Sequence, residues 1–186
     1  MDLISCVCLT IPGREHFLQR ALDCFARQTY PHKELIVVDG PETVGAKRNI
    51  GCKASQGVYV ALFDDDDYSS PKRLEVQVAA LMATGRGVTA FRQMPFVQNG
   101  EWFYHPGIDK EGVDTSLFFR RSFWERHRFE ETMIGQDAKF SREAIAENKF
   151  LLMEDAGVMF AENHSGNTCD RDSRSWTKLV DYHWED

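Results

Sequence analysis

The sequence predicts an α/β domain in which a mostly parallel central sheet with flanking helices is followed by a half of mixed elements. Strand-like and helix-like segments alternate three times over residues 1–87, the pattern of a parallel sheet covered by helices. Asn99-Gly100 stands between two β-prone runs and predicts a hairpin in the second half. The 186 residues, 42% hydrophobic and 27% charged, suit a single folded domain.

The first half pairs three apolar runs with three helical patterns. Residues 3–10 (LISCVCLT) are almost continuously apolar, as in a strand buried on both faces. Pro71 occupies the favoured first turn of the third helix, and the expected buried stripe of that helix is Leu74, Val78, Leu81 and Met82. The expected elements are a strand at 3–10, a helix at 14–27, a short buried strand at 34–38, a helix at 45–55, a strand at 58–63 and a helix from Pro71 to Gly85.

The second half begins with the hairpin at 96–104. Strands are expected at 115–119, 150–153 and 157–161, with a helix at 136–148 whose apolar side is Phe140, Ala144 and Ile145. No Gly/Ser/Pro-rich linker divides the chain. We therefore expect one domain over 1–186, made of a first half at about 1–87, a second half at about 88–168, and a tail at 169–186.

Charge and cysteine content narrow the function classes. The chain has 22 Lys and Arg residues and 29 Asp and Glu residues, a net charge of −7. This charge disfavours sequence-independent binding to nucleic acid or to an anionic membrane. No apolar run approaches the ~20 residues of a membrane-spanning helix, and no secretory signal is visible at the N-terminus. The expectation is a soluble cytoplasmic protein without membrane insertion. Free thiols are expected at the cysteines, which are Cys6, Cys8, Cys24, Cys52 and Cys169.

Four consecutive aspartates, Asp64 to Asp67, follow the third predicted strand directly. In an open α/β sheet, ligands bind outside the carboxyl ends of the strands. Carboxylates crowded there repel one another unless a cation neutralises them, and hard oxygen ligands suit Mg²⁺ or Mn²⁺. The alternative is a solvated acidic turn that caps the helix at Pro71.

Further polar groups follow the other strands. Thr10 and Pro12 come after the first strand, and Asp39 ends the second, where its carboxylate is able to accept from a base edge. Lys47, Arg48 and Asn49 open the next helix, where cations and helix N–H groups suit phosphates; alone, the two cations would be assigned to a solvated helix face. Together these groups indicate a site for a nucleotide diphosphate held through a divalent metal.

Two long segments resemble a known family. They are ISCVCLTIPGREHFLQRALDCFARQTYPHKELIVVDG and GAKRNIGCKASQGVYVALFDDDDYSSPKRLE, and weaker likeness continues through DTSLFFRRSFWERHRFEE, GQDAKFSREA and ENHSGNT. In these segments the chain resembles family 2 glycosyltransferases with the nucleotide-diphospho-sugar transferase (GT-A) fold. The likeness spans roughly residues 4–168.

The resemblance implies roles for the donor site. It places Thr10 and Pro12 in the nucleobase pocket, and Asp39 on the base edge, typically uracil N3. Arg48 is expected near the base or diphosphate with Asn49 beside it. The D-x-D motif falls on the acidic run: Asp64 and Asp66 occupy it, Asp66 is the expected direct metal ligand, and Asp65 is placed to meet the ribose.

The resemblance also implies the catalytic groups. Asp137 stands at the position of the catalytic base, and His164 matches a late histidine that completes the metal or diphosphate site. On local sequence alone Asp137 is equally an N-cap of the helix. The chain departs from the family at two places: Asp39-Gly40 replaces a pair of aspartates, and Gln136-Asp137 replaces a Glu-Asp pair.

The resulting hypothesis is a metal-dependent, inverting glycosyltransferase that moves a sugar from a nucleotide-sugar, most simply a UDP-sugar, to an acceptor hydroxyl with Mn²⁺ or Mg²⁺. The acceptor stays open among glycans, small molecules, proteins and, with less support, hydroxyl-bearing nucleic acids. The alternatives are a nucleotidyltransferase, disfavoured by the single glycine and arginine of LTIPGRE, and a catalytically inactive nucleotide- or metal-binding module.

Two further clusters have open interpretations. The aromatic group on or beside the hairpin is either core or a sugar-stacking surface; it consists of Phe96, Trp102, Phe103, Tyr104 and His105. The basic run at 119–128 is either a solvated helix with a buried Phe/Trp side or a contact for a phosphate-bearing acceptor.

Overall fold

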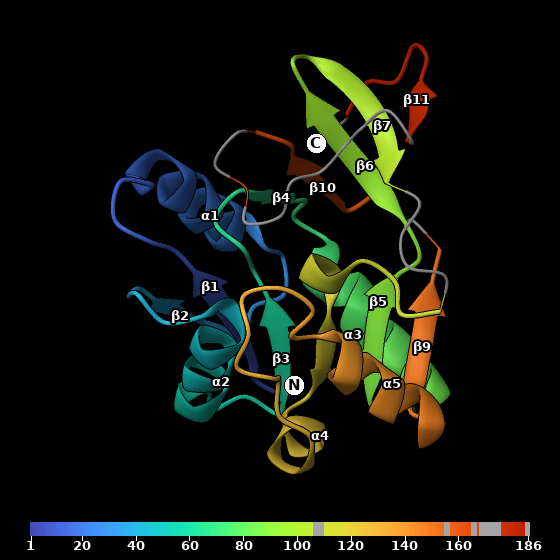
Figure 1. Cartoon of the computed structure of the whole chain (residues 1–186). Coiled ribbons are helices and arrows are strands. Elements are labelled where there is room, and N and C mark those ends of the chain that lie inside the picture. Colours follow the sequence, from blue (N-terminus) through green and yellow to red (C-terminus); the bar gives the residue numbers. More distant parts are fainter. Residues whose placement is uncertain (106–109, 155–156, 165–166, 168–175, 185–186) are drawn as a thin grey trace.

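The computed structural model describes residues 1–105, 110–154, 157–164, 167 and 176–184. The described part contains two β-sheets with helices around the larger one (Figure 1). The strands are β1 (Ile4–Leu9), β2 (Lys33–Val38), β3 (Tyr59–Leu62), β4 (Asp67–Ser69), β5 (Val88–Phe91), β6 (Met94–Gln98), β7 (Glu101–His105), β8 (Phe118–Arg120), β9 (Phe150–Met153), β10 (Met159–Glu162) and β11 (Thr177–Leu179). The helices are α1 (Glu15–Arg27), α2 (Val44–Ala54), α3 (Arg73–Thr84), the 3₁₀ turn η1 (Asp114–Ser116), α4 (Arg121–Arg126) and α5 (Ala138–Ala146).

The larger sheet has the strand order β2-β1-β3-β8-β5-β9. β1 lies parallel to both β2 and β3, and β5 lies parallel to β9, whereas β8 runs antiparallel to both of its neighbours. The first three strands therefore end at one edge of the sheet, so the segments that follow them meet there. The mostly parallel sheet predicted from the alternating pattern is confirmed.

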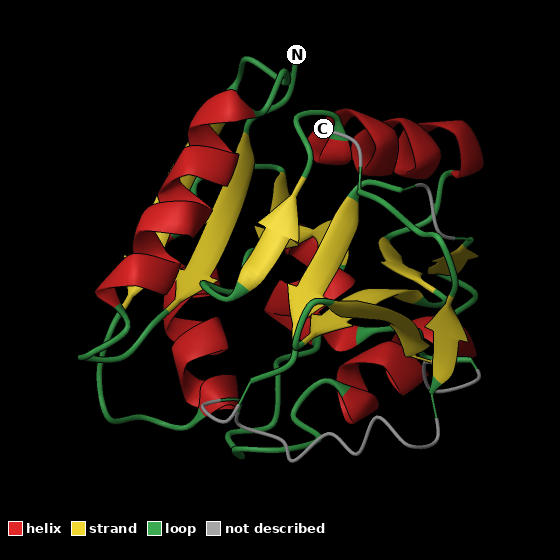
Figure 2. Ribbon diagram, turned by 90° about the horizontal axis from the view of Figure 1, so that it is seen from above, coloured by secondary structure: helices red, strands yellow, loops and turns green. Residues whose placement is uncertain are grey.

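Alternate residues of the central strands pack into two separate cores, one on each face of the sheet. Ile4, Cys6 and Cys8 of β1 join the core that also contains residues of α1 and α3. Val7 and Leu9 join the core that contains residues of α2, α4 and α5. Figure 2 shows helices on both faces of the sheet. The expectation that β1 is buried on both faces is confirmed.

The smaller sheet has the order β11-β7-β6-β10-β4. The predicted hairpin is present as β6 and β7, and both turn residues have positive φ, 52° at Asn99 and 78° at Gly100. Two successive positive φ values match a tight hairpin turn, which favours Asn-Gly because glycine and asparagine tolerate this conformation. β4 begins at Asp67, so the last aspartate of the acidic run belongs to a strand paired with β10.

Several sequence-based expectations need correction. Met82 is 67% exposed and Ile145 is 37% exposed, so neither belongs to a buried stripe; each lies at the edge of its helix's apolar face. β2 is an edge strand, and its Val37 is 42% exposed, so this strand is not buried as expected. The strand expected at 115–119 is divided into η1 and β8, and α3 begins at Arg73, after the turn that contains Pro71.

Cys6, Cys8, Cys24 and Cys52 are free and buried, as expected, and Cys169 lies outside the described residues. Burial raises the pKa of Cys6, Cys8 and Cys52, so these thiols stay protonated and unreactive at neutral pH. In the described ranges, no helix is both long and apolar enough to cross a membrane.

Candidate active site

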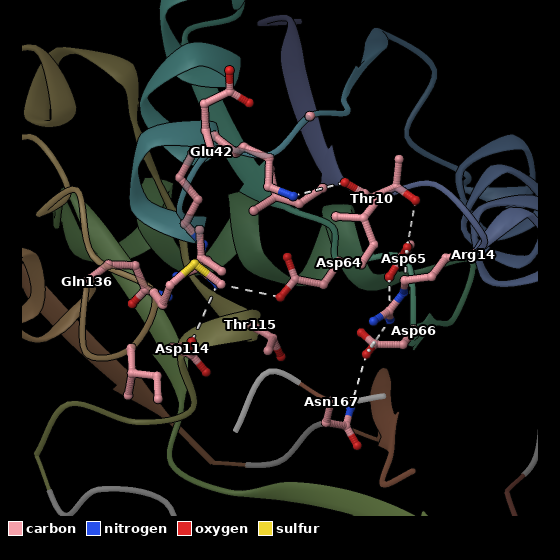
Figure 3. A pocket seen from close by; sticks show the side chains of 18 of the residues that line it. Thr10, Arg14, Glu42, Asp64, Asp65, Asp66, Asp114, Thr115, Gln136 and Asn167 are labelled. Carbon is pink, nitrogen blue, oxygen red and sulfur yellow. Dashed lines mark hydrogen bonds and ion pairs between the residues drawn. The ribbon is translucent and has the colours of Figure 1, made fainter. Parts of the chain in front are cut away.

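A cavity of about 250 Å³ lies beside the carboxyl ends of β1, β2 and β3. Figure 3 shows the side chains that line it. The lining residues are Leu9, Thr10, Ile11, Arg14, Gly40, Pro41, Glu42, Val44, Lys47, Arg48, Asp64, Asp65, Asp66, Asp114, Thr115, Met133, Ile134, Gly135, Gln136 and Asn167. The structure thus brings together five of the predicted site residues, Thr10, Arg48, Asp64, Asp65 and Asp66, from three segments far apart in the sequence.

Arg14, just before α1, binds two neighbouring carboxylates of the acidic run (Figure 3). Its Nε and Nη2 donate to the two oxygens of Asp65 at 3.1 and 2.7 Å, and Nη2 also donates to Asp66 Oδ2 at 2.7 Å. Thr10 Oγ1 donates to Asp65 Oδ2 at 2.8 Å. Because Asp65 is 3% exposed and both its oxygens are engaged, the acidic run is not a solvated turn.

Asp66 is the carboxylate on which the groups from the C-terminal part of the chain converge. Asn167 Nδ2 donates to Asp66 Oδ2 at 3.1 Å, and His164 Nε2 lies 3.3 Å from the same oxygen. The His164 ring is stacked on Phe17 of α1 at a centroid distance of 4.5 Å. The predicted pairing of the acidic run with a late histidine is therefore present in space.

This donor set fits a divalent metal that takes its remaining ligands from a substrate. In the part of the chain that the structure describes, no three or more His, Cys, Asp and Glu side chains are placed to hold a metal by themselves. Mg²⁺ is commonly held by one or two carboxylates together with substrate phosphates. Asp66, with His164 beside it, meets that requirement once a diphosphate is present.

Arg48 is a buried cation at the centre of the cavity wall. Its side chain is 1% exposed, and Nη2 lies 3.5 Å from Asp64 Oδ2 and 3.4 Å from Asp114 Oδ2. Arg48 Nε, Arg48 Nη1 and Asp64 Oδ1 are buried without a hydrogen-bond partner among the described residues. Burial raises the pKa of Asp64 to about 6, an effect that Arg48 opposes. Buried polar groups left unpaired in this way are rare and mark this wall of the cavity as a place for a polar ligand, an ion or water.

Asp137 follows the lining residue Gln136 and immediately precedes α5. Asp137 occupies the N-cap position of α5, as the alternative interpretation expected, but its side chain makes no capping hydrogen bond to the helix. Burial raises the pKa of Asp137 to about 6, and the negative charge of Asp114 adds to this while Arg48 opposes it. The carboxyl group is thus within electrostatic range of the cavity, although the structure does not place it in the lining.

The loop before Asp137 rests on Gly45 in the first turn of α2. A Cβ at Gly45 would lie 1.8 Å from the carbonyl oxygen of Glu130 and 2.9 Å from Gln136 Cβ, and Gly45 N donates to Thr132 O at 3.1 Å. Only glycine permits this approach, so position 45 sets the distance between α2 and the loop that ends at Asp137.

Gly45→Ala is therefore expected to reduce activity even though alanine favours helices. Overpacking of this kind typically costs about 1–3 kcal/mol, and relief of the clash moves the loop of Gln136. The matched control is Gly51→Ala in the same helix, whose Cβ would meet Val7 at 2.3 Å, away from the loop. Both variants should lower Tm. At a temperature where both are folded, a kcat for Gly45→Ala as high as that for Gly51→Ala would refute this role.

Of the other predicted donor-site residues, Lys47 lines the cavity together with Arg48, whereas Pro12, Asp39 and Asn49 are not in the lining. Lys47 and Arg48 are 5% and 1% exposed, so the solvated-helix interpretation is wrong for both; Lys47 Nζ donates to Thr10 O at 2.9 Å. Asn49 donates to Phe129 O and accepts from Trp124 Nε1, which fixes the chain before the 130–136 loop. Pro12 and Asp39 are exposed beside the cavity. The nucleotide roles of Pro12, Asp39 and Asn49 stay predictions.

Sequence reasoning missed Arg14, Asp114 and Asn167. Arg14 lies four residues after Thr10, and Asp114 stands directly before the strand expected at 115–119, so chain position was an available signal for both. Asn167 lies within the segment ENHSGNT, three residues after His164. Its importance is visible only in the fold, which brings it to Asp66.

The two ambiguous clusters lie away from the cavity lining as far as the described residues show. Phe96 is 1% exposed, Trp102 packs against Phe160, and Phe103 against Trp176, while the side chain of His105 lies outside the described set. In the basic run, Phe123 and Trp124 are buried, and its arginines pair with acids or lie over aromatic rings, as Arg126 does with Glu147. Core packing accounts for Phe96, and a helix with a buried Phe/Trp side accounts for the basic run. Trp102, Phe103 and Tyr104 are partly exposed, so their sugar-stacking interpretation stays a prediction.

Comparison with known proteins identifies the family to which the chain belongs. A family model described as Glycosyl transferase family 2 matches residues 40–145, more than half of the chain. The match includes Asp64, Asp65, Asp66 and Asp137. A search of curated protein sequences found no match.

Two solved structures illustrate the fold. S. aureus TarS 1–349 in complex with UDP-GlcNAc has a TM-score of 0.73 and 18% identity, over 89% of this chain and 60% of that one. The mannosyltransferase PcManGT from Pyrobaculum calidifontis in complex with GDP-Man and Mn²⁺ has a TM-score of 0.63 and 15% identity, over 87% of this chain and 56% of that one. The chain thus spans about 60% of the TarS structure's length. The predicted GT-A fold is confirmed.

Proposed function

The chain belongs to glycosyl transferase family 2, and we propose that it is a metal-dependent, inverting transferase of a sugar from a nucleotide-sugar, most simply a UDP-sugar, to an acceptor hydroxyl. The observation that best supports the proposal is the set of unpaired buried atoms in the cavity. Among the described residues, Arg48 Nε and Nη1 and Asp64 Oδ1 have no hydrogen-bond partner, and a nucleotide-sugar offers both anionic acceptors and hydroxyl donors. TarS and PcManGT were solved with UDP-GlcNAc and with GDP-Man and Mn²⁺, which supports a nucleotide-sugar here.

The donor would lie along the carboxyl edge of the first three strands. Lys47 and Arg48 provide positive charge near the start of α2, where helix N–H groups also favour phosphate. Asp66 and His164 would hold Mn²⁺ or Mg²⁺, which when bound would neutralise charge that develops on the leaving diphosphate. Thr10 and Arg14 keep Asp65 fixed, so the acidic run is held in one shape before the donor binds.

Asp137 would accept the proton of the attacking hydroxyl. General-base catalysis is most effective when the pKa of the base lies near the working pH, and burial raises the pKa of Asp137 to about 6. A single base acting on the face opposite the leaving diphosphate inverts the anomeric centre. The acceptor class stays open, and a cytoplasmic location stays a prediction from the sequence.

Base recognition would depend in part on Asp39. One carboxylate oxygen accepts from Gly40 N at 2.7 Å, and the other accepts no hydrogen bond among the described residues, so it is available to a ring N–H such as uracil N3. Asp39→Ala is expected to weaken UDP about tenfold, the lower end for a charge-assisted hydrogen bond, because the side chain is exposed. Isothermal titration with UDP and CMP measures this. Equal losses for both nucleotides would remove the assignment, since cytosine has no ring N–H donor.

A thermal-shift panel tests the proposed donor. UDP-, GDP-, CMP- and dTDP-sugars are each added with and without Mn²⁺. A ligand at 100 times its Kd stabilises the folded state by about 2.7 kcal/mol, which is a rise of about 5–10 °C for a domain of this size. We expect the largest rise with a UDP-sugar and Mn²⁺ together. If no nucleotide-sugar moves Tm in the presence of Mn²⁺, the proposal is wrong.

A further inference from the structure

Arg14 is an internal cation inside the candidate metal site. Its guanidinium makes hydrogen bonds to both oxygens of Asp65 and to Asp66 Oδ2, and its central carbon lies 4.8 Å from the centroid of the Phe17 ring. Only 15% of the side chain is exposed. Packing and charge therefore hold it in this position.

The oxygen that Arg14 contacts is the one a metal would need. Asp66 Oδ2 is 2.7 Å from Arg14 Nη2, and it is also the oxygen that faces His164 and Asn167. A divalent metal binds a carboxylate oxygen at about 2.0–2.2 Å. A metal and a guanidinium at the same oxygen repel each other, so Arg14 opposes metal binding there for as long as it keeps its contact with Asp66.

We propose that Arg14 competes with the divalent metal for Asp66, so that the metal binds weakly to the free protein and firmly only together with a nucleoside diphosphate. The inference rests on the proposed donor site. Arg14 lines the same cavity, and a guanidinium released from Asp66 is able to pair with a diphosphate oxygen, for which its planar fork is suited. The diphosphate thereby provides ligands for the metal and a new partner for the displaced arginine.

The small number of metal ligands that the protein supplies also weakens metal binding in the absence of nucleotide. Asp66 and His164 are too few to hold a metal by themselves, and no larger group of metal-binding side chains is present in the described ranges. Binding of metal and of nucleotide is then cooperative, and by linkage each must raise the affinity of the other by the same factor. Arg14 sets the size of that factor, because it lowers the affinity of metal alone.

Arg20 provides a matched control. It lies on α1, the helix that follows Arg14, and its guanidinium carbon is 5.2 Å from the same Phe17 ring. It donates to Glu162 and to the main-chain oxygen of Asp66, but not to the Asp66 carboxylate. Arg20→Gln removes one positive charge from the same region without freeing the oxygen that the metal needs.

The experiment is a titration of the full chain with Mn²⁺ alone, followed by electron paramagnetic resonance of free Mn²⁺. Arg14→Gln is expected to bind Mn²⁺ about tenfold or more tightly than the unmodified protein. Arg14→Lys, which keeps the charge, should gain much less, and Arg20→Gln should stay within about threefold. Arg14→Met keeps the packing on Phe17 and replaces Arg14→Gln if circular dichroism shows the latter to be unfolded.

A repeat of the titration with saturating UDP separates a failure of the Arg14 competition from a failure of the proposed donor and metal site. The ratio of Mn²⁺ affinities with and without UDP should shrink in Arg14→Gln by at least the factor that Mn²⁺ alone gains, because the variant also lacks the pairing of Arg14 with the diphosphate. One outcome is that the unmodified protein binds Mn²⁺ in the presence of UDP, but neither Arg14→Gln nor Arg14→Met binds Mn²⁺ more tightly than Arg20→Gln in the absence of UDP. That outcome refutes the competition by Arg14 and leaves the proposed function standing. If Mn²⁺ fails to bind even with UDP, the proposed metal site fails, and the role of Arg14 with it.

Discussion

Asp137→Asn is expected to lower kcat by about 10²–10⁴-fold, the usual contribution of a positioned general base, while donor binding survives. Asparagine keeps the shape of the side chain but cannot accept the acceptor's proton. The loss should appear in kcat and not in the donor KM, as for a group used only in the transition state. Single-turnover kinetics with a nucleotide-sugar at saturation measure it.

The pH dependence provides a second readout for Asp137. The folded-state pKa, about 6, lies above the ordinary aspartate value because of burial. The base must be ionised, so kcat should fall as pH drops through this region. The same shift means that ionised Asp137 opposes folding at neutral pH, a cost relieved as pH falls from about 6 toward 4. Asp137→Asn should therefore not lower Tm at pH 7.

Two outcomes would reassign Asp137. Unfolding of Asp137→Asn would indicate that the residue supports the start of α5, despite the absence of a side-chain cap. A normal transfer rate would mean that another group is the base, and Glu130 and Glu131, both exposed upstream in the same loop, would be substituted next.

Asp66→Ala is expected to abolish the effect of Mn²⁺ on nucleotide binding while the protein stays folded. Asp66 is the carboxylate at which Arg14, His164 and Asn167 meet, so its loss removes the proposed direct metal ligand. His164→Ala should reduce the Mn²⁺ effect less, because Asp66 remains. Calorimetric titration with UDP, with and without Mn²⁺, measures both.

An undiminished Mn²⁺ effect in Asp66→Ala would contradict the assignment of the metal ligand. Asp66→Asn is the matched isostere: it keeps the volume and removes the charge, so it should behave as Asp66→Ala does. If Asp66→Asn retains the Mn²⁺ effect, the metal depends on a neutral oxygen ligand or on another residue.

The fold was largely predictable because its signals are local. The apolar run of β1 and the helical spacing of α1 are visible in short windows, and Asn99-Gly100 encodes a two-residue turn. Exposure of Val37 on β2 was not predictable, because an edge strand and a central strand share the same apolar composition. The division of 115–119 into η1 and β8 depends on tertiary contacts, such as the bond from Arg73 Nη2 to Thr115 O at 3.4 Å.

The site residues that lie next to one another in the sequence were predictable from their charge. The site residues that meet only through contacts between distant segments were not. The acidic run is recognisable in the sequence, because four adjacent carboxylates repel one another unless a cation or hydrogen-bond donors neutralise them. Arg14 and Asn167 are ordinary residues in sequence, and only the fold shows that both reach Asp66. The contacts of Asn49 were equally hidden in the sequence: its amide bonds to Phe129 and Trp124, while its nucleotide role stays a prediction.

The most direct test of the central claim is metal-dependent release of nucleoside diphosphate from a nucleotide-sugar by the full chain, with water in place of the acceptor. The account predicts slow release of UDP from a UDP-sugar with Mn²⁺, no release after chelation with EDTA, and a first-formed free sugar whose anomeric configuration, followed by proton NMR, is inverted. Release that continues at the same rate in EDTA, or no release from any UDP-, GDP-, CMP- or dTDP-sugar, would contradict it.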